Sequence, residues 1–584
     1  MLKSTLVALL LTLLARKSYD PMITNDVSEE YDFIVVGAGA SGAVVARGLS
    51  DKTGMTVLLL EAGESDYNNP LVPSAIKYGE LQQSPYNWNY DVAKQKYSLL
   101  EIGKNAKYPG GKILGGSTAI NGMNYVRGSP HDYDSWEDHG AKGWSWKDVE
   151  PFFRKNENAV DDKISEKAGR GGLLNISISY ENPFTAKLKT AAKEIGIREV
   201  DYFDEIEGIS RFVCTRYKGL RQSSSEAFLR SGYKERQKSL HIVTNALVSK
   251  IHFVTGTSGK QKATGVSFIK DGKISNVKAR KEIILSAGAL RTPQILMLSG
   301  IGLKNHLEEM EIEVVRDLPG VGANFQDHFG HFVHHAIEDS QFASHTTPES
   351  ITEYIINGTG HNSAALGGSV VLHHRTKYFG TNVSLSNKKR PFPSIQALFT
   401  SANIPVVFEP TKNHTFHTLL LLAVLHPKSK GEIRLKSTNP TDQPIIDPNY
   451  LSEEDDIKMY IEGFRKLEEF EMTKAMKEIG FRLVTPQVCN GSLYTNPPRP
   501  DEFYRCYVKS FGYAAHACCT AKIGQEDDEM AVVDERLRVR HVEGLRVADA
   551  SVMPHVTSSN TQAPCYMIGR KASKMMKQDW NMNE

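Results

Sequence analysis

Three glycines and one acidic residue near the N-terminus have the residue types and spacing that bind a dinucleotide. Gly37, Gly39 and Gly42 form a Gly-x-Gly-x-x-Gly pattern, and Glu61 follows it. Glycines allow a tight turn and let the backbone approach a pyrophosphate at the start of a helix, while Glu61 can accept hydrogen bonds from an adenosine ribose. A plain turn between a strand and a helix is the alternative. The pattern predicts a dinucleotide without separating NAD from FAD.

The residues around this pattern predict the elements that would position it. Residues 33–36 are a continuous apolar run of the kind that is buried on both faces of a parallel sheet. Residues 43–49 have the apolar spacing of a helix, and residues 56–60 predict a second buried strand that ends on Glu61. This order is a βαβ unit, which places the glycines at the N-terminus of a helix.

A second glycine-rich stretch, residues 110–128, has a composition suited to contact with a flat ring. Consecutive glycines let the backbone touch a planar group, and Ser117 and Asn121 supply hydrogen-bonding groups nearby. Taken by itself, this stretch would be only a flexible loop.

Several ordered segments, including this one, resemble the signatures of the glucose–methanol–choline (GMC) oxidoreductases. They are GKILGGSTAIN at 111–121, GMNYVRG at 122–128, GALRTP at 288–293 with LSGIG at 298–302, NFQDH at 324–328 and DASVMP at 549–554. The resemblance extends from Tyr31 to about Lys574 and implies FAD as the cofactor. The residues that it places on FAD, together with the three glycines, are Glu61, Ser117, Asn121, Val248, Asp549, Ala550 and Thr561.

The resemblance also implies the fold. It is an α/β fold, α+β overall, in which a Rossmann-like FAD-binding domain is joined to a substrate-binding domain built on an antiparallel sheet. Residues 31–330 would be mainly FAD-binding, residues 331–544 mainly substrate-binding, and residues 545–577 would return to the first domain. Independently of the family, the pair Asp271-Gly272 predicts a β-hairpin turn.

His516 and Asn560 match the catalytic pair of the family. His516 ends the sequence YAAH, and Asn560 lies in SNTQAP, where some members have a second histidine. An imidazole that titrates near neutral pH suits a general base, so His516 would accept the alcohol proton while the substrate carbon passes a hydride to the flavin. Asn560 would donate a hydrogen bond to the substrate oxygen. Pro564, expected at the first helical position, predicts that the last helix starts beside Asn560 and directs its N-terminal dipole at the flavin.

Three positions depart from the family pattern. Cys519 stands where a glycine is common three residues after the catalytic histidine, Ala517 replaces a common proline, and Gly110 replaces a basic residue. A side chain at Cys519 could crowd the turn that aims His516. One alternative is therefore a catalytically silent, secreted relative that binds FAD.

The layout is similar to insect members of the secreted type, such as glucose dehydrogenases and the glandular alcohol oxidases of leaf beetles. We therefore expect oxidation of a primary alcohol to an aldehyde, with a small aryl or allylic alcohol as substrate and dioxygen favoured over another electron acceptor. A sugar dehydrogenase of the same family is an alternative, and the GMC signatures argue against a nicotinamide-dependent enzyme. Residues 330–424 should line the substrate pocket, where the available side chains include His331, His334, His335 and Phe399.

The composition excludes some partners, and the N-terminus predicts export. The 584 residues include 70 basic and 68 acidic ones with no long basic run, which argues against binding to nucleic acid or to an acidic membrane surface. Lys3 and the apolar run 6–14 predict a secretory signal over residues 1–18, with a buried N-terminal helix or strand as the alternative. Secretion without a membrane anchor agrees with five glycosylation sequons, at Asn175, Asn357, Asn382, Asn413 and Asn490.

The six cysteines add two predictions. Cys489 and Cys506 are near enough in the sequence to close one disulfide loop in an oxidising compartment. Cys518 and Cys519 are neighbours, but no CxxC or Cys/His cluster accompanies them, so we expect buried thiols and no metal site.

Overall fold

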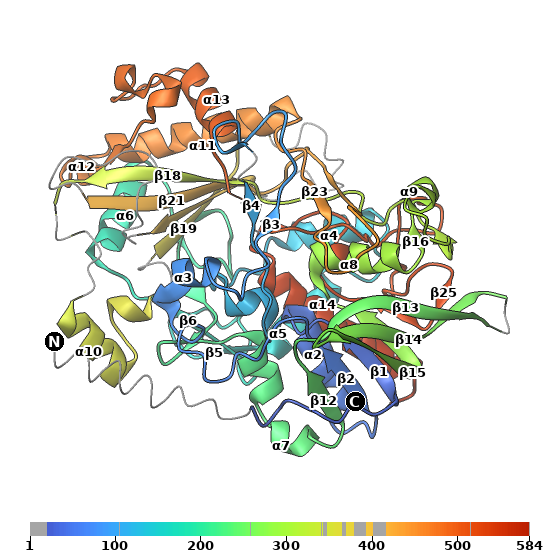
Figure 1. Ribbon diagram of the computed structural model, residues 1–584. Helices are drawn as coiled ribbons and strands as arrows, with labels where there is room; N and C mark the ends of the chain where they lie inside the picture. Colours follow the sequence, from blue (N-terminus) through green and yellow to red (C-terminus); the bar gives the residue numbers. More distant parts are fainter. Residues whose placement is uncertain are drawn as a thin grey trace.

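The computed structural model (Figure 1) describes most of the chain after residue 19. The described residues are 20–103, 106–256, 259–339, 342, 347–364, 369–378, 393–400, 416–513 and 516–582. The predicted signal and the sequons at Asn382 and Asn413 lie outside them. Within the described ranges, no helix combines the length and the apolar character needed to cross a bilayer.

The first sheet contains the predicted βαβ unit. Its strands follow the order β12 (Leu240–Val243), β2 (Val57–Leu60), β1 (Glu30–Val36), β15 (Lys273–Leu285), β14 (Gln261–Lys270) and β13 (Leu247–Thr255), with β26 (Leu545–Val547) paired to β15 and β25 (Val542–Glu543) paired to β14. The ladders β12–β2, β2–β1, β1–β15 and β15–β26 are parallel, whereas β13, β14 and β15 form an antiparallel meander. Asp271 and Gly272 both have positive φ, 50° and 72°, so the predicted hairpin turn is confirmed.

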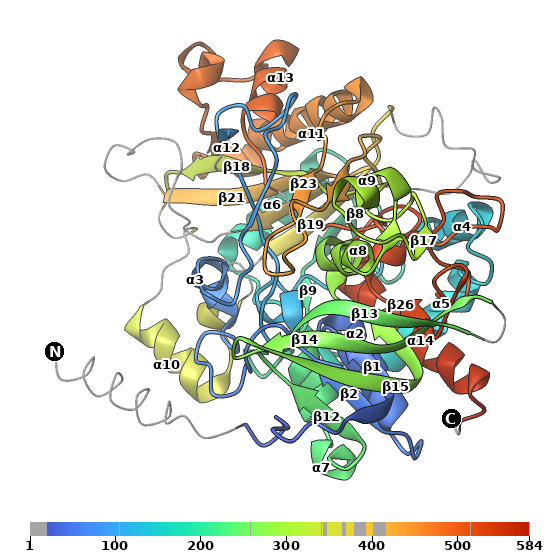
Figure 2. The ribbon, with the colours of Figure 1, turned by 45° about the vertical axis from the view of Figure 1, so that its right-hand side comes forward.

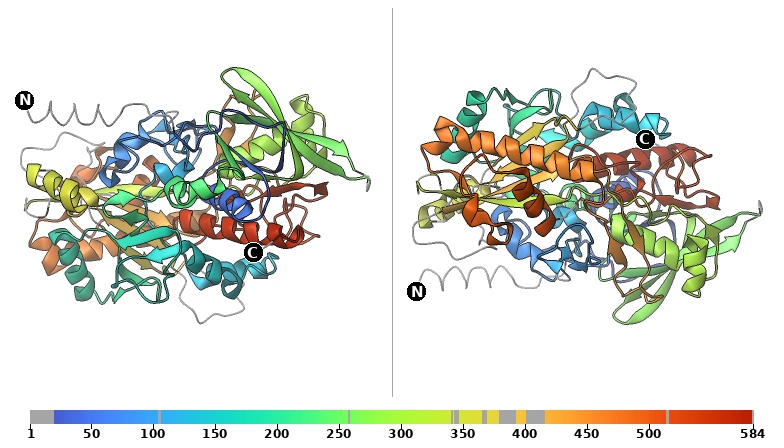
Figure 3. Two further views of the ribbon diagram at one scale, coloured as in Figure 1. Left: turned by 90° about the horizontal axis from the view of Figure 1, so that it is seen from below. Right: turned by 90° about the horizontal axis from the view of Figure 1, so that it is seen from above.

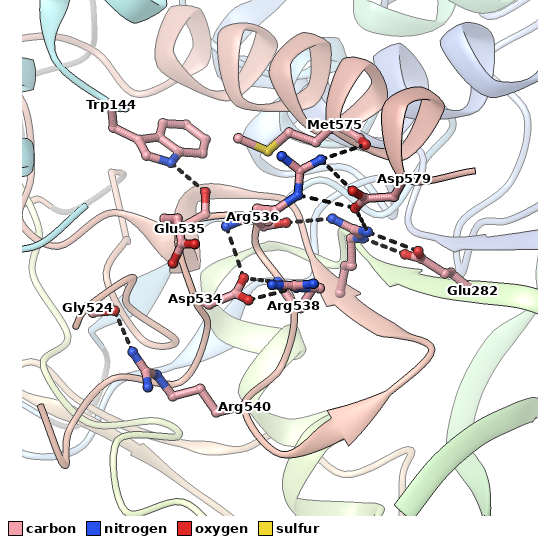
Figure 4. A network of polar contacts seen from close by, with 11 residues as sticks. Trp144, Glu282, Gly524, Asp534, Glu535, Arg536, Arg538, Arg540, Met575 and Asp579 are labelled. Carbon is pink, nitrogen blue, oxygen red and sulfur yellow. Dashed lines mark hydrogen bonds and ion pairs between the residues drawn. The ribbon is translucent and has the colours of Figure 1, made fainter. Parts of the chain in front are cut away.

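Two helices from opposite ends of the chain pack together against this sheet. Helix α2 (Ala40–Ser50) follows the glycine turn, and α14 (Gln562–Asp579) lies beside it, as the view from below in Figure 3 shows. A buried ion network fixes the far end of α14. The guanidinium of Arg546 in β26 donates to Glu282 of β15 over 3.0 Å and also pairs with Asp579, while its Nη1 reaches the Arg536 carbonyl over 2.7 Å. Figure 4 shows Glu282, Arg536 and Asp579 meeting there.

This network gives a stability prediction. Arg546 is only 2 % exposed, so Arg546→Met would leave the carboxylate of Glu282 buried without its cation. We expect the free energy of unfolding to fall by about 3–5 kcal/mol, measured by urea denaturation of the purified protein. The exposed pair Arg538–Asp534 supplies the control, since Arg538→Met should cost at most about 1 kcal/mol. Equal losses in the two variants would contradict the prediction.

The second sheet is antiparallel except at one edge. Its order is β24 (Arg482–Leu483), β18 (Gly330–Ile337), β21 (Phe416–Val424), β20 (Ile395–Thr400), β19 (Ser369–His374), β8 (Gly208–Arg211) and β7 (Glu199–Val200), and only β7 and β8 are parallel. Helix α11 (Glu454–Met472) packs on β20 and β21 and lies above the sheet in Figure 1 and along it in the right-hand view of Figure 3. The predicted combination of a Rossmann-like α/β part with an antiparallel second sheet is confirmed. The sheet draws on two distant parts of the chain, because β7 and β8 come from residues 199–211.

The remaining elements connect and cover these two sheets, and Figure 2 shows them from a second side. They are α3 (Tyr78–Gln82), β3 (Tyr90–Asp91), β4 (Lys107–Tyr108), α4 (Pro130–Asp138), α5 (Trp146–Asn156), β5 (Glu157–Ala159), β6 (Leu174–Ile178), α6 (Pro183–Glu194), β9 (Val213–Cys214), β10 (Arg216–Tyr217), β11 (Leu220–Arg221), α7 (Tyr233–Arg236), α8 (Gly288–Leu298), β16 (Ile301–Gly302), α9 (Lys304–Glu309), β17 (Arg316–Asp317), α10 (Pro348–Asn357), β22 (Glu432–Arg434), β23 (Ile445–Asp447), α12 (Lys474–Lys477) and α13 (Asp501–Ser510). Cys489 and Cys506 form the predicted disulfide. Cys518 and Cys519 are buried free thiols, as predicted.

Candidate active site

One cavity extends from the first sheet to the second. Its wall includes the glycine turn, the end of β2, residues 108–124, β13, the start of α8, strands β20 and β21, and the start of α14. Every catalytic or FAD-binding residue predicted from the sequence lies on this wall except Gly42. The residues brought together are Gly37, Gly39, Glu61, Ser117, Asn121, Val248, His516, Asp549, Ala550, Asn560 and Thr561.

The three glycines of the turn serve two different needs. A Cβ on Gly37 would lie 2.4 Å from the carbonyl oxygen of Ser286, and a Cβ on Gly42 would lie 1.9 Å from that of Gly37, so both positions are required for packing. Gly37 also has a φ of +97°, which favours glycine. A Cβ on Gly39 would meet no protein atom within 4 Å. The open space at Gly39 lies at the N-terminus of α2, where a phosphate would bind.

Glu61 and Val248 lie at the same end of the cavity. The Glu61 carboxylate accepts the backbone N–H of Ala38 over 2.9 Å and that of Gly63 over 2.8 Å, which fixes its direction. Burial raises the pKa of this carboxyl to about 7, and those backbone donors act against the rise. Val248, in β13, is 4 % exposed and pairs with β14. Glu61 keeps acceptor capacity for a neutral hydroxyl donor such as a ribose diol.

Residues 110–122 are folded tightly and do not form the flexible loop that their composition alone would predict. A Cβ on Gly111 would lie 2.2 Å from the backbone of Gly116, so this chain crossing needs glycine. Ser117 Oγ accepts the Gly111 N–H over 3.0 Å. Asn121 Nδ2 donates to Gln562 Oε1 over 3.0 Å and ties the segment to the start of α14.

Asp549, Ala550 and Thr561 organise two helix starts. Asp549 Oδ2 accepts the Gly288 N–H over 2.9 Å, so its carboxylate lies at the N-terminus of α8. The carbonyl of Ala550 accepts the N–H of Cys519 over 3.0 Å. Thr561 precedes the first residue of α14, which is Gln562. Pro564 therefore occupies the third helical position, and the prediction of the first was wrong; proline fits there because no N–H of the first turn has an intrahelical partner.

His516 and Asn560 meet in the cavity. Asn560 Nδ2 lies 3.1 Å from His516 Nε2, and Asn560 Oδ1 accepts from Asn124 Nδ2 over 2.6 Å. The backbone N–H of His516 donates to Asp327 Oδ1 over 2.7 Å. Burial, with a smaller contribution from neighbouring His328, lowers the pKa of His516 to about 3. The ring is therefore neutral at physiological pH, but the titration near neutral pH that the sequence led us to expect is wrong for the buried ring.

The comparisons with known proteins agree with this geometry. The model of the GMC oxidoreductase N-terminal domain matches residues 31–330, and the C-terminal model matches residues 427–569. The chain belongs to the GMC oxidoreductase family. Glucose dehydrogenase [FAD, quinone] of Drosophila pseudoobscura pseudoobscura is 34% identical over 94% of this chain and 87% of its own, and ecdysone oxidase of Spodoptera littoralis is 33% identical over 97% and 94%. Formate oxidase of Aspergillus oryzae RIB40 has a TM-score of 0.82 at 26% identity and covers 95% of this chain and 99% of its own.

This GMC oxidoreductase is an FAD-dependent enzyme that acts on CH–OH donors, as predicted. Two observations show that the residues of the cavity fit FAD. Gly39 offers space that any side chain would fill, and the buried Asn124 Oδ1 has no hydrogen-bond partner among the described residues. A buried acceptor without a partner is costly, so a donor from a bound molecule is expected there.

Cys519, at the position where we expect the family to have a glycine, has a backbone conformation that favours glycine in this GMC oxidoreductase. Its φ is +76°, in the left-handed region, and its side chain is fully buried. The turn is thus kept with a cysteine in it, and His516 still reaches Asn560. The feature that favoured a silent relative therefore does not displace the catalytic pair.

The turn at Cys519 gives a second prediction. Cys519→Gly should leave the rate of flavin reduction unchanged within about twofold and alter the free energy of unfolding by less than about 1 kcal/mol, because relief at positive φ offsets the lost thiol contacts. Cys519→Val should lower that free energy by about 2 kcal/mol or more, because a β-branched residue is strained at positive φ. Denaturation and anaerobic flavin reduction of both variants test this. A valine variant as stable as the glycine variant would contradict it.

The second sheet supplies an apolar part of the cavity wall. Leu398 from β20 and Leu421 from β21 line it, together with Tyr78 and Tyr513, whose hydroxyls are 3.0 Å apart. The four side chains expected in the pocket are not among the lining residues. Phe399 packs against Phe470, and the ring of His335 stacks on Phe481, while His331 and His334 are buried in β18. Alternation along β20 explains the error for Phe399, because Gln396 and Leu398 take the cavity face and the next residue takes the other.

Sequence reasoning gave no role to two residues beside the predicted catalytic pair. Asn124 contacts Asn560, and His328 Nδ1 lies 3.0 Å from His516 Nδ1. Both residues belong to segments that resemble the family, 122–128 and 324–328, so the signal was present. Their partners are 188 and 436 residues away in the sequence, and only the fold brings them together.

Proposed function

We propose that this enzyme oxidises a small aryl or allylic primary alcohol to its aldehyde, with His516 as the general base. The observation that carries the proposal is the meeting of His516 Nε2 and Asn560 Nδ2, 3.1 Å apart, in a cavity with an apolar wall. In the reaction the alcohol O–H bond breaks and its proton goes to His516 Nε2. The α-carbon loses a hydride, and the C–O bond becomes C=O.

The neighbours of His516 prepare it for this role. Its low pKa leaves Nε2 unprotonated at physiological pH, and Asp327 holds its backbone. Asn560 is oriented by Asn124, so its amide N–H is directed at the place where the substrate oxygen must lie. That donor stabilises the negative charge that develops on the oxygen as the proton leaves.

FAD, when bound, supplies the two-electron acceptor for the hydride. Gly39 and Glu61 would hold its nucleotide part, and Asn121 and Thr561 lie where the other end of the cavity reaches the start of α14. The N-terminus of α14 favours negative charge at this point. The two electrons then pass to dioxygen or to another acceptor, one equivalent per turnover.

The chemistry of the wall supports an uncharged, largely apolar substrate. The charged residues among the described lining residues are Glu61, Arg291 and Asp549, and none belongs to the second sheet. Arg291 already donates to Gln294, and Asp549 already accepts from Gly288. A quaternary ammonium would lack a counter-ion beside Leu398 and Leu421.

We also propose that the protein is secreted. The apolar leader supports this, as does the disulfide between Cys489 and Cys506, because disulfides persist in oxidising compartments. The sequons at Asn357 and Asn490 are exposed and could carry glycans. Asn175 is a poorer acceptor, because its amide nitrogen already donates to Gln222 over 3.1 Å.

The proposal is tested by an anaerobic alcohol panel followed by oxygen. Purified yellow enzyme is mixed with benzyl alcohol, an allylic alcohol, glucose and choline, and flavin bleaching is followed by absorbance. We expect the first two to reduce the flavin at least about tenfold faster than glucose or choline, because one misplaced polar or charged contact costs about 1–3 kcal/mol. Fast recovery of the yellow colour with oxygen indicates an oxidase, and slow recovery a dehydrogenase.

A sugar dehydrogenase is the second candidate, favoured by the 34% identity to an insect glucose dehydrogenase. Reduction by glucose at a rate equal to or above that with benzyl alcohol would replace the first proposal by this one. A flavin that no member of the panel reduces would support the silent relative.

A further inference from the structure

The segment 324–328 packs directly against the turn that carries His516. Backbone hydrogen bonds join Gln326 to Cys518 in both directions, at 3.3 and 3.0 Å. Asp327 accepts the N–H of His516, and Asn324 Nδ2 donates to the Cys519 carbonyl over 3.3 Å. These contacts fix the position of the imidazole, but a fixed ring can still carry its proton on either nitrogen. The position of that proton decides whether Nε2 can act as a base.

A chain of hydrogen bonds determines where the proton lies. His328 Nε2 is 3.0 Å from the carbonyl oxygen of Leu425, and a carbonyl only accepts, so His328 carries its hydrogen on Nε2. The ring of His328 is fully buried, which lowers its pKa to about 4, although the Leu425 and Thr557 carbonyls favour its protonated form. It is therefore neutral, and its Nδ1 is an acceptor.

The ring of His516 must then carry its hydrogen on Nδ1, the nitrogen that faces His328. His516 Nδ1 lies 3.0 Å from His328 Nδ1, and one of the two nitrogens has to donate. Because His328 Nδ1 accepts, His516 Nδ1 carries the hydrogen. The neutral His516 ring then has its lone pair on Nε2, the atom beside Asn560 and the cavity.

We infer that His328 is a positioning residue, which transmits the polarity of the Leu425 carbonyl to His516 and keeps Nε2 of that ring unprotonated for the alcohol. This inference rests on the proposed function, in which His516 Nε2 accepts the alcohol proton. It assigns to the 324–328 segment a task besides packing. His328 itself lines the cavity but exchanges no proton with the substrate.

Substitutions of His328 test the inference in the full-length, FAD-loaded enzyme. His328→Leu removes the acceptor, and we expect anaerobic flavin reduction by the best alcohol to slow by about 10- to 100-fold, as for other partners that orient a functional histidine. His328→Gln keeps an amide N–H for Leu425 and an amide oxygen for His516, so the rate should return to within about fivefold of the wild type. A role in packing alone would not favour glutamine over leucine.

His331→Leu is the matched control. Like His328, His331 is a buried histidine, but it lies in β18 against Phe329 and Tyr460 and has no described contact with His516. The reduction rate of this variant should equal that of the wild type. Wild-type speed in an FAD-loaded His328→Leu variant, or no gain from leucine to glutamine, would overturn the inference while leaving the proposed function intact.

A direct measurement separates the two proposals. In the wild-type protein labelled with [15N]histidine, the ring resonances of His516, assigned by their loss in His516→Gln, should show a protonated Nδ1 and a bare Nε2. The opposite tautomer would overturn the inference. This result does not depend on turnover, so it decides the matter even if no alcohol reduces the wild-type flavin, which would refute the proposed function, or if His328→Leu does not retain FAD.

Discussion

Replacing His516 by alanine should slow anaerobic reduction of the flavin by at least about 1000-fold while the purified protein stays yellow. A positioned general base contributes about 10²- to 10⁴-fold, and His516 is the neutral base that contacts Asn560 Nδ2 among the residues that the structure describes. FAD should remain bound, because the glycine turn and Glu61 lie at the other end of the cavity. The measurement is stopped-flow absorbance with the best alcohol of the panel.

Asn560→Ala should slow flavin reduction less than His516→Ala does. It removes the amide donor but leaves the base, so the loss should be smaller, about 10- to 100-fold, as expected when one charge-stabilising donor is removed. Both variants should fold, and Asn560→Ala should lose about 1–3 kcal/mol of the free energy of unfolding because Asn124 loses its acceptor. Near-normal reduction in His516→Ala would show that another group takes the proton.

The second large effect is expected at the glycine turn. Gly39→Val should give a folded protein that has lost at least about 100-fold in FAD affinity, or about 2.7 kcal/mol. The backbone of Gly39 has a φ of −72° and an extended ψ, which valine adopts readily, and its Cβ would meet no protein atom. The new side chain would fill only the space through which a pyrophosphate reaches the N-terminus of α2.

Gly79→Val is the matched control for this variant. Gly79 also has no protein atom within 4 Å of a built Cβ, but it lies on the outside of α3 and not on the cavity wall. Its FAD content, measured by absorbance after gel filtration, should match that of the wild type. If Gly39→Val copurified with a full complement of FAD, the nucleotide would have to bind elsewhere. If circular dichroism showed that the Gly39→Val protein is unfolded, the side chain at position 39 would have to clash with the protein itself, which contradicts the open space at Gly39.

The sequence predicts best what depends on neighbouring residues. The buried strand at 33–36, the glycine turn and Asp271-Gly272 are encoded within a few residues, and the structure has them where the patterns place them. The cofactor, and the catalytic pair that we propose, followed from resemblance to a family, which supplies long-range information that one sequence lacks. The role of His328 could not be predicted, because it depends on the carbonyl of Leu425 at a distance of 97 residues.

Two errors have physical causes of the same kind. Phe399 was expected in the pocket because its type suits a substrate wall, but the direction of a strand side chain is decided by register, which composition does not reveal. Pro564 was expected at the first helical position, and the helix starts two residues earlier, since the whole first turn tolerates proline. Residue type indicates what a position can do, and the fold determines which way it faces.

The cavity has one part that carries the proposed chemistry and another, from the second sheet, that would contact the substrate. The glycine turn and Asn560 lie at the starts of α2 and α14, and His516 is held by the segment 324–328 before β18. Leu398 and Leu421 project into the cavity from β20 and β21. Substitutions of Leu398 and Leu421 can therefore reshape what the enzyme accepts, because neither side chain contacts His516 or the glycine turn in the described hydrogen bonds and ring contacts. Such an arrangement lets a lineage exchange one alcohol for another in small steps, each of which leaves a working enzyme. Relatives named for glucose, ecdysone and choline, all about equally similar to this chain, are what such a history would leave behind.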